Sequence, residues 1–496
     1  MPISIDSTDQ FTEKCGVFGI IGRNFDDHTG LEAARMTFYG LWALQHRGQE
    51  SSGIVSSDGT NLHSHAAQGL VATVYREEDL EQLPGHLAIG HNRYSTSGGA
   101  DDCYNQPFLD RKHKFALAHN GNLPDTSELE KFLKDRKVEI DGKNDTAMMV
   151  AAITWFIDDG LDMIAAIKKA WPLFTGAFSI VAMDATRLVA FRDECGIRPL
   201  SIGTIDGGYV VASETCAFDT VGAEFLRDVE PGELVVIDDK ELVSEQIVKS
   251  NLKLDIFEMV YFARPDSMLL GKRIDLVRQE FGRRMAKEFP IDADVVVPVP
   301  DSAIPAAIGY SQASGIPFEM ALIKNRYIHR TFIRPTTQLR ERDLKMKLNP
   351  VVDLFKDKRV VIVDDSIVRG TTMRHLVSML FEAGAKEVHL LISCPPVRYP
   401  DFYGINTPRQ TELMAAYMTI QEMADAVGAT SLHFLSFEGM ISATGLSEDV
   451  FNNSCFNGNY PISIGKRAQE IVPLNPGEKL PQTDFAPAKL ANARTT

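Results

Sequence analysis

The segment VVIVDDSIVRGTT, residues 360–372, places two acids between a hydrophobic run and a row of small and hydroxylated residues. The β-branched run at 360–363 predicts a strand that is buried on both faces. Asp364 and Asp365 end this strand, and after a short loop the apolar spacing predicts a helix that ends at Gly384. Where a strand leads into a helix, small residues let backbone N–H groups and the helix dipole hold a phosphate. Two adjacent acids suit ribose hydroxyls or a ligand-borne Mg²⁺, so the segment predicts a site for a phosphorylated sugar.

The same segment resembles the phosphoribosyl pyrophosphate (PRPP) loop of type I phosphoribosyltransferases in its hydrophobic strand, paired acids and Gly-Thr-Thr sequence. An ordinary strand–loop–helix corner with a solvated acidic pair is the alternative. A Walker loop is excluded, because neither GxxxxGKS nor GxxxxGKT occurs in the chain. Upstream, residues 324–347 carry eight Lys and Arg residues against Glu341 and Asp343, which predicts either a solvated basic loop or a mobile lid that faces phosphates.

Cys15 begins the apolar strand pattern CGVFGIIG, where a lone cysteine is most often a buried core residue. Four motifs follow it, at residues 39–55 (YGLWALQHRGQESSGIV), 90–98 (GHNRYSTSG), 117–123 (LAHNGNL) and 143–149 (KNDTAMM). Together with Cys15 they resemble a class II glutamine amidotransferase domain of the N-terminal-nucleophile type. Joined to the PRPP-type half, they resemble the glutamine phosphoribosylpyrophosphate amidotransferase family over roughly residues 15–460.

Two different sequence patterns must position these residues. Residues 15–238 predict many short strands with glycine-rich corners and segregated helices, which favours packed antiparallel sheets. The resemblance implies an α+β N-terminal-nucleophile domain with αββα layers. Residues 256–460 alternate between helix and strand patterns, which predicts an α/β type I phosphoribosyltransferase domain with a mostly parallel sheet. We expect the polar stretch 239–255 to be a linker and residues 461–496 to be a C-terminal tail.

Composition narrows the class of protein. A chain of 496 residues can hold two or three domains, and its formal net charge of −16 disfavours a nucleic-acid-binding surface. Apolar runs are too short for a membrane span, the N-terminus lacks a signal-peptide pattern, and six cysteines show no CxxC spacing. We therefore expect a cytoplasmic protein that binds neither nucleic acid nor membranes.

The resemblance implies a glutaminase reaction in the first half. Cys15 would attack the side-chain carbonyl of glutamine, release ammonia and leave a γ-glutamyl thioester for water to hydrolyse. Its own α-amino group would serve as the base, since such an amine has a pKa near ~8. Asn120 and Gly121 would form the oxyanion hole. Three further residues would bind or orient glutamine. Arg93 would bind its α-carboxylate, Asp145 would bind its α-ammonium, and Arg47 would help orient the site. We expect the motif histidines to be structural, namely His46, His91 and His119.

In the second half, the resemblance implies that ammonia displaces pyrophosphate from ribose C1 of PRPP to give 5-phosphoribosylamine, which commits carbon to purines. Positioning and charge neutralisation should dominate this catalysis. One Mg²⁺ per subunit is expected, with Ser302, Asp364 and Asp365 as its residues, and the same acids could hold the ribose hydroxyls. Lys324 and Arg326 would reach the pyrophosphate. The 5′-phosphate would be held by Ser366, Arg369, Gly370, Thr371 and Thr372. The basic segment 324–347 would close over PRPP and complete a path for ammonia.

The position of Cys15 requires a further step, because its amine is locked in a peptide bond with Lys14. Some family members carry a short propeptide, so we expect residues 1–14 to be a propeptide that is cleaved after Lys14. A start codon assigned too far upstream is the alternative.

Many propeptide-bearing relatives hold a 4Fe–4S cluster through four cysteines. At the matching places this chain has Asp255, Asp401, Asn452 and Cys455. Thiolates are the usual ligands of such clusters, so we expect no iron–sulfur cluster.

Two other functions remain open at this point. Another class II amidotransferase, such as one that aminates a hexose phosphate, would need a sugar isomerase half. A PRPP-sensing regulator would need a basic DNA-binding module. The family resemblance further implies a homotetramer or dimer whose feedback inhibitors are purine nucleotides.

Overall fold

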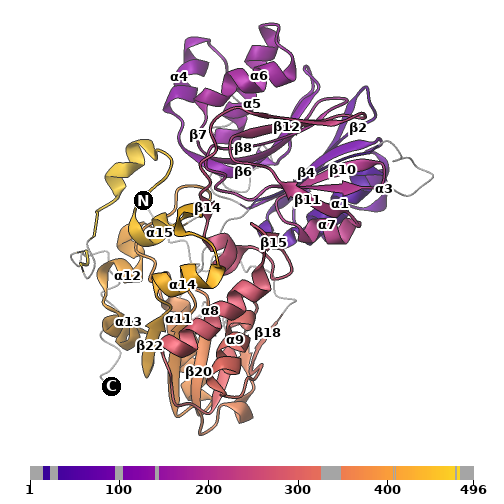
Figure 1. Cartoon of the computed structure of the whole chain (residues 1–496). Coiled ribbons are helices and arrows are strands. Elements are labelled where there is room, and N and C mark those ends of the chain that lie inside the picture. The colour runs from indigo at the N-terminus through magenta and orange to yellow at the C-terminus, as the bar shows by residue number, and fades with distance from the viewer. Residues whose placement is uncertain are drawn as a thin grey trace.

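The computed structural model describes residues 15–22, 32–94, 104–139, 144–325, 348–405, 407, 409–474 and 478–480. Its two halves are a β-sandwich formed by the first half of the chain and an α/β unit built on a parallel sheet (Figure 1). The expected propeptide, Arg326 and nearly all of the basic segment lie outside the described residues.

Two antiparallel sheets form the sandwich. The seven-stranded sheet has the order β11-β9-β10-β1-β4-β2-β3, with bounds β1 (Gly16–Gly22), β2 (Ser51–Ser57), β3 (Leu62–Gln68), β4 (Leu87–Arg93), β9 (Ser201–Ile205), β10 (Gly208–Ala212) and β11 (Glu224–Asp228). The six-stranded sheet has the order β13-β12-β8-β7-β6-β5, with bounds β5 (Phe108–Asp110), β6 (Phe115–Asp125), β7 (Thr175–Met183), β8 (Leu188–Arg192), β12 (Glu233–Ile237) and β13 (Leu242–Gln246). β1 lies in the middle of its sheet, between β10 and β4.

Apolar side chains fill the space between the sheets, and helices cover the two outer faces. Val17 and Ile89 from one sheet pack in the same inner cluster as Val181 and Met183 from the other. The outer helices are α1 (Ala33–Ala43) and α7 (Cys216–Val221) on the seven-stranded sheet, and α4 (Ser127–Asp135), α5 (Asp145–Asp158) and α6 (Met163–Ala170) on the six-stranded sheet. The αββα layering expected from the family resemblance is confirmed.

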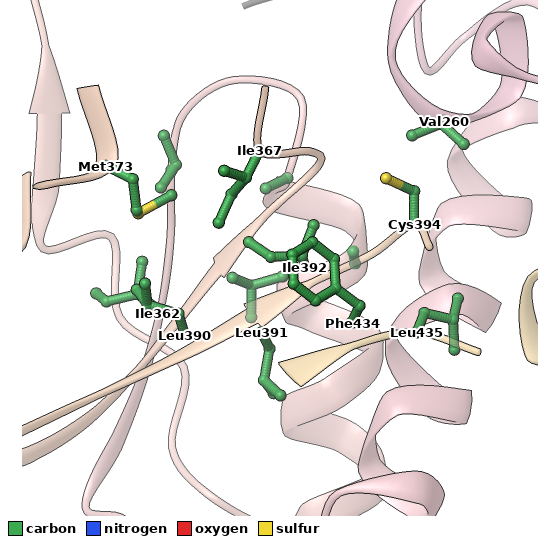
Figure 2. Packing of buried hydrophobic residues seen from close by; sticks show 14 of the residues in the cluster. Val260, Ile362, Ile367, Met373, Leu390, Leu391, Ile392, Cys394, Phe434 and Leu435 are labelled. Carbon is green, nitrogen blue, oxygen red and sulfur yellow. The ribbon is translucent and has the colours of Figure 1, made fainter. Parts of the chain in front are cut away.

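A parallel sheet of order β17-β20-β21-β22 forms the centre of the second half, with bounds Val295–Pro298, Arg359–Asp364, Glu387–Ile392 and Ser431–Phe434. Its helices are α8 (Ile274–Glu288), α9 (Ile304–Ser314), α11 (Thr371–Glu382), α13 (Ile420–Val427) and α14 (Phe437–Thr444). Figure 2 shows part of its core, in which the labelled strand residues pack with Met373 of α11, and the same cluster includes Val260. Strand residues 360–363 are fully buried, as the apolar run predicts.

The structure differs from the expected division of the chain at two boundaries, those at residues 238 and 460. Residues 242–246, expected in the linker, form β13 and pair with β12, so the sandwich extends to Gln246. They have a polar sequence because β13 is an edge strand with mostly exposed side chains. Residues 461–464, expected in the tail, contain Ile462 and Ile464, which are buried against Phe402 and Tyr403 where the two halves meet. Within the described part of the chain, no helix is long and apolar enough to cross a bilayer.

Candidate functional site

Cys15 lies immediately before β1 and is partly buried. Its Sγ is 4.0 Å from the carbonyl oxygen of Tyr94, and its own carbonyl accepts a hydrogen bond from Arg47 Nε at 3.2 Å. β1 contacts β6 across the sandwich, so the thiol comes from one sheet and the neighbouring HNGN motif from the other. The sandwich therefore brings together residues more than 100 positions apart.

Asn120 and Gly121 lie on β6 and have the properties of an oxyanion site. Asn120 is buried, and its Nδ2 has no hydrogen-bond acceptor among the described residues. A buried amide donor without an acceptor carries a free-energy cost, which an oxygen of a bound substrate would remove. Gly121 has φ +150°, and a Cβ there would lie 2.1 Å from the carbonyl oxygen of Ala177. Only glycine fits this position.

The two residues expected to bind the ends of glutamine are each connected to a strand of the sandwich that carries part of this site. Gly16 of β1 pairs with Asn92 of β4, so the next position in the register places Arg93 beside Cys15. Asp145 opens α5, and its Oδ2 accepts a hydrogen bond from the backbone N–H of Leu123 at 3.0 Å. Arg93 therefore lies on the strand that pairs with β1, and Asp145 is hydrogen-bonded to β6, the strand that carries the HNGN motif.

The motif histidines make internal contacts. His119 Nδ1 lies 3.1 Å from Thr146 Oγ1, and its Nε2 lies 3.2 Å from the carbonyl oxygen of Ala177. Burial lowers the pKa of His91 to about 3, so this ring is neutral, and its Nε2 lies 3.1 Å from the carbonyl oxygen of His119. These contacts agree with the structural roles expected for them.

Arg47 is enclosed by protein and does not face an open space. Its side chain is fully buried, and its Nη atoms donate to Glu214 and, at 2.7 and 3.0 Å, to Glu258. Burial opposes the charged form, but the two carboxylates raise the pKa of Arg47 above its usual value. The hydrogen bond to Cys15 fits the expected role of Arg47 in orienting the site.

In the second half of the chain, two parallel strands bring the predicted PRPP residues together. Pro298 of β17 pairs with Val363 of β20, so the loops after both strands meet at one edge of the sheet. There Ser302 Oγ donates to Asp365 Oδ2 at 2.5 Å. Burial and the neighbouring Asp365 raise the pKa of Asp364 well above its usual value. Two ionised carboxylates at this edge of the sheet are therefore unfavourable without a ligand. A bound cation or sugar hydroxyls would stabilise their charged forms.

The loop after Asp365 leads into the first turn of α11. Gly370 precedes the helix with φ +78°, a left-handed conformation that favours glycine, and a Cβ there would lie 2.6 Å from Met414 Sδ. Ser366 Oγ donates to Asp365 Oδ1 at 2.6 Å, and Arg369 Nη2 pairs with Glu412 at 2.9 Å. The expected phosphate residues Thr371 and Thr372 occupy the first turn of α11, the end of the helix whose dipole favours an anion.

Lys324 lies at the end of β18 (Leu322–Lys324), which pairs with β19 (Leu348–Pro350). Its Nζ lies 2.8 Å from Asp301 Oδ2, beside Ser302 in the loop after β17. The two short strands therefore bring the start of the basic segment to the same edge as the acidic pair.

The four positions matched to cluster cysteines in relatives also converge. Asp255 pairs in register with Asn452, and burial, opposed by Arg198 and reinforced by Asp401, raises the pKa of Asp255 to about 8. Burial and both Asp charges raise the pKa of the Cys455 thiol well above its usual value. One protonated thiol among carboxyl and amide groups does not fit an iron–sulfur cluster.

A buried network that the sequence analysis did not identify joins the two halves. Arg198 donates from Nε to the carbonyl of Tyr403 at 3.2 Å and from Nη1 to Glu258 at 3.2 Å. Asn122, next to the oxyanion residues, donates to the carbonyl of Phe402 at 2.8 Å. The available signal was an acid within the apolar run IFEMVYF at 256–262, since an unpaired buried carboxylate is unfavourable and implies a basic partner.

Comparisons with known proteins match both halves. One family model, described as a glutamine amidotransferase domain, matches residues 91–220, and another, described as a phosphoribosyl transferase domain, matches residues 272–402. The amidophosphoribosyltransferase of Synechocystis sp. is 48% identical over 471 residues, covering 93% of this chain and 94% of that protein. The amidophosphoribosyltransferase of Bacillus subtilis is 45% identical, covering 91% of this chain and 95% of that protein.

Solved structures agree. A glutamine PRPP amidotransferase from B. subtilis, complexed with ADP and GMP, has a TM-score of 0.84 at 44% identity and covers 91% of this chain and 98% of its own. A structure of the allosteric regulatory enzyme of purine biosynthesis has a TM-score of 0.85 at 44% identity and covers 92% of this chain and 97% of its own.

Proposed function

The chain belongs to the amidophosphoribosyltransferase family, and from this premise we propose which of its residues perform each half of the reaction. It hydrolyses glutamine to glutamate and ammonia and transfers the ammonia to PRPP, giving 5-phosphoribosylamine and pyrophosphate. This reaction is the first committed step of purine biosynthesis. A hexosephosphate amidotransferase and a PRPP-sensing regulator are both disfavoured, because the relatives match this chain over both of its halves.

In the first half, Cys15 is the proposed nucleophile and its α-amine the base. The tetrahedral intermediate would place its oxyanion between Asn120 Nδ2 and the backbone N–H of Gly121. The single observation that carries this assignment is the buried Asn120 donor without an acceptor among the described residues, on the strand opposite the thiol. Arg93 would bind the α-carboxylate of glutamine and Asp145 its α-ammonium, because Arg93 follows the partner of Gly16 in the β1–β4 register and Asp145 is hydrogen-bonded to Leu123 of β6.

In the second half, the acidic edge would hold the ribose of PRPP and the start of α11 its 5′-phosphate. Mg²⁺ is usually bound through one or two carboxylates, phosphates and water, so Ser302, Asp364 and Asp365 fit it without further ligands. When bound, Mg²⁺ would offset charge on the departing pyrophosphate. Lys324, which pairs with Asp301 beside Ser302, would approach that pyrophosphate. Arg326, with the rest of the proposed lid, lies outside the described residues.

Substitution of the nucleophile tests the division of labour. We expect Cys15→Ala to lose glutamine-dependent synthesis and glutaminase activity while ammonia-dependent synthesis from PRPP stays within about twofold, because the second site is intact. Retention of glutaminase activity in this variant would contradict the assignment of Cys15.

Five finer features are proposals. The α-amine of Cys15 becomes available only if the bond to Lys14 is cut, and intact-mass measurement of the active enzyme decides this. We propose that no iron–sulfur cluster forms, which assays for iron and acid-labile sulfide test. We propose feedback by purine nucleotides, since the B. subtilis relative was solved with ADP and GMP, and a homotetramer or dimer, which light scattering tests. A reducing compartment, the cytoplasm, would keep the Cys15 thiol free.

A further inference from the structure

A buried carboxylate from the other half of the chain contacts Arg47, which in turn donates to the carbonyl of Cys15. Glu258 belongs to η4 (Glu258–Phe262), a helical turn whose neighbours Phe257, Met259 and Val260 are buried in the phosphoribosyltransferase core. Arg278 of α8 holds this turn through hydrogen bonds to the carbonyls of Met259, at 2.8 Å, and Ala263, at 2.9 Å. Glu258 therefore has a fixed position relative to the parallel sheet.

Glu258 binds Arg47 in the bidentate geometry that fixes the plane of a guanidinium. Its two oxygens accept from Nη1 at 3.0 Å and Nη2 at 2.7 Å, and both side chains are fully buried. With both Nη atoms held in this way, the remaining Nε–H of Arg47 is directed at the carbonyl of Cys15. The orientation of the nucleophile residue is thus coupled to the position of η4.

Glu214, the other acid on Arg47, cannot take over this role. Its Oε1 also lies 2.7 Å from His46 Nε2, and its Oε2 accepts from Ser267 Oγ at 2.6 Å and from the backbone N–H of Arg264 at 2.9 Å. It contacts a single Nη atom of Arg47. Glu214 compensates the charge of Arg47. Glu258 also compensates this charge, and its bidentate contact fixes the orientation of the guanidinium.

We propose that Glu258, from the phosphoribosyltransferase half, is a positioning residue for glutamine hydrolysis, acting through Arg47 on Cys15. The inference rests on the proposed role of Cys15 as the nucleophile. It implies that the glutaminase site is complete only when both halves are present, and that a substitution outside the amidotransferase domain can remove glutaminase activity selectively.

The test compares Glu258→Gln with the parent enzyme in three measurements: glutaminase activity with PRPP present, ammonia-dependent synthesis, and the pH profile of glutaminase kcat/KM. We expect glutaminase kcat to fall at least tenfold, KM for glutamine to stay within about threefold, and ammonia-dependent synthesis to stay within about twofold. Loss of the carboxylate leaves positive charge near the Cys15 amine, which lowers the amine pKa, so the acidic limb of the profile should move to lower pH. A merely structural role would reduce the amount of active enzyme without moving this limb.

Glu233→Gln is the matched control, since Glu233 is also buried and binds Arg227 bidentately, at 2.8 Å through both oxygens, away from Cys15. It should change neither activity by more than about twofold. Two outcomes overturn the proposal. The first is a ratio of glutaminase to ammonia-dependent activity in Glu258→Gln that equals the ratio in the parent enzyme. The second is that Glu258→Gln and Glu258→Asp each lose the two activities to the same extent. If Cys15→Ala itself retains glutaminase activity, the proposed function fails before this inference is reached.

Discussion

Removal of the Asn120 side-chain amide gives the sharpest test of the oxyanion assignment. Its Nδ2 is buried and has no acceptor among the described residues, so Asn120→Ala removes no hydrogen bond made by that atom in the free enzyme. The same donor in a buried site is worth about 3 kcal/mol to an oxyanion, and each 1.36 kcal/mol is a factor of ten. We therefore expect glutaminase kcat to fall by about 100-fold, with a change in Tm of less than about 3 °C.

The assay is release of glutamate by purified enzyme at saturating glutamine, with ammonia-dependent synthesis measured in parallel. Ammonia-dependent synthesis should be unchanged, because Asn120 lies in the sandwich and the proposed PRPP site lies at the parallel sheet. Asn122→Ala is the matched control: its Nδ2 already donates to the carbonyl of Phe402, so its loss costs about 1 kcal/mol of stability and less than about fivefold in glutaminase activity. A fall of less than threefold in Asn120→Ala, or an equal fall in the Asn122 variant, would refute this reasoning.

Two further predictions concern the second half. Gly370→Ala places an alanine in a left-handed conformation before α11, which costs about 1–2 kcal/mol, and its Cβ crowds Met414. We therefore expect KM for PRPP to rise about tenfold, both with glutamine and with ammonia as the nitrogen source. A rise with only one nitrogen source would count against a phosphate role for this loop. The pKa of Asp255 is about 8 in the folded state and 3.8 in the unfolded state, so between these two pH values the folded state binds one more proton than the unfolded state. The free energy of unfolding therefore falls with rising pH in that window, by up to about 1.4 kcal/mol per pH unit. Asp255→Asn should therefore raise Tm relative to the parent at pH 8 and less so at pH 5, as followed by calorimetry; a Tm difference that is the same at both pH values would exclude the buried neutral carboxyl.

Local sequence predicted those parts of the site that depend on neighbouring residues. The run at 360–363 could only be a fully buried strand, and the Asp-Asp pair, Gly370 and the hydroxyls follow it within one loop, so their common location needed no long-range information. The edge strand Leu242–Gln246 was not predicted, because an exposed edge strand has the same polar composition as a linker. Ile462 and Ile464 were assigned to the tail for a related reason, since the surface that buries them combines Phe402 and Tyr403 with residues of the first half of the chain, such as Ile197.

The sequence by itself determined which groups are available for chemistry: the thiol of Cys15, an Asn–Gly pair, and two acids before a Gly-Thr-Thr segment. Only the tertiary structure decided how these groups are held. It placed Arg47 between Glu214 and Glu258 and joined the halves through Arg198, as a consequence of charge compensation between residues up to 211 positions apart. A guanidinium can be buried only where carboxylates meet it, and which carboxylates do so is fixed by the packing of two domains, which no local pattern of residues encodes.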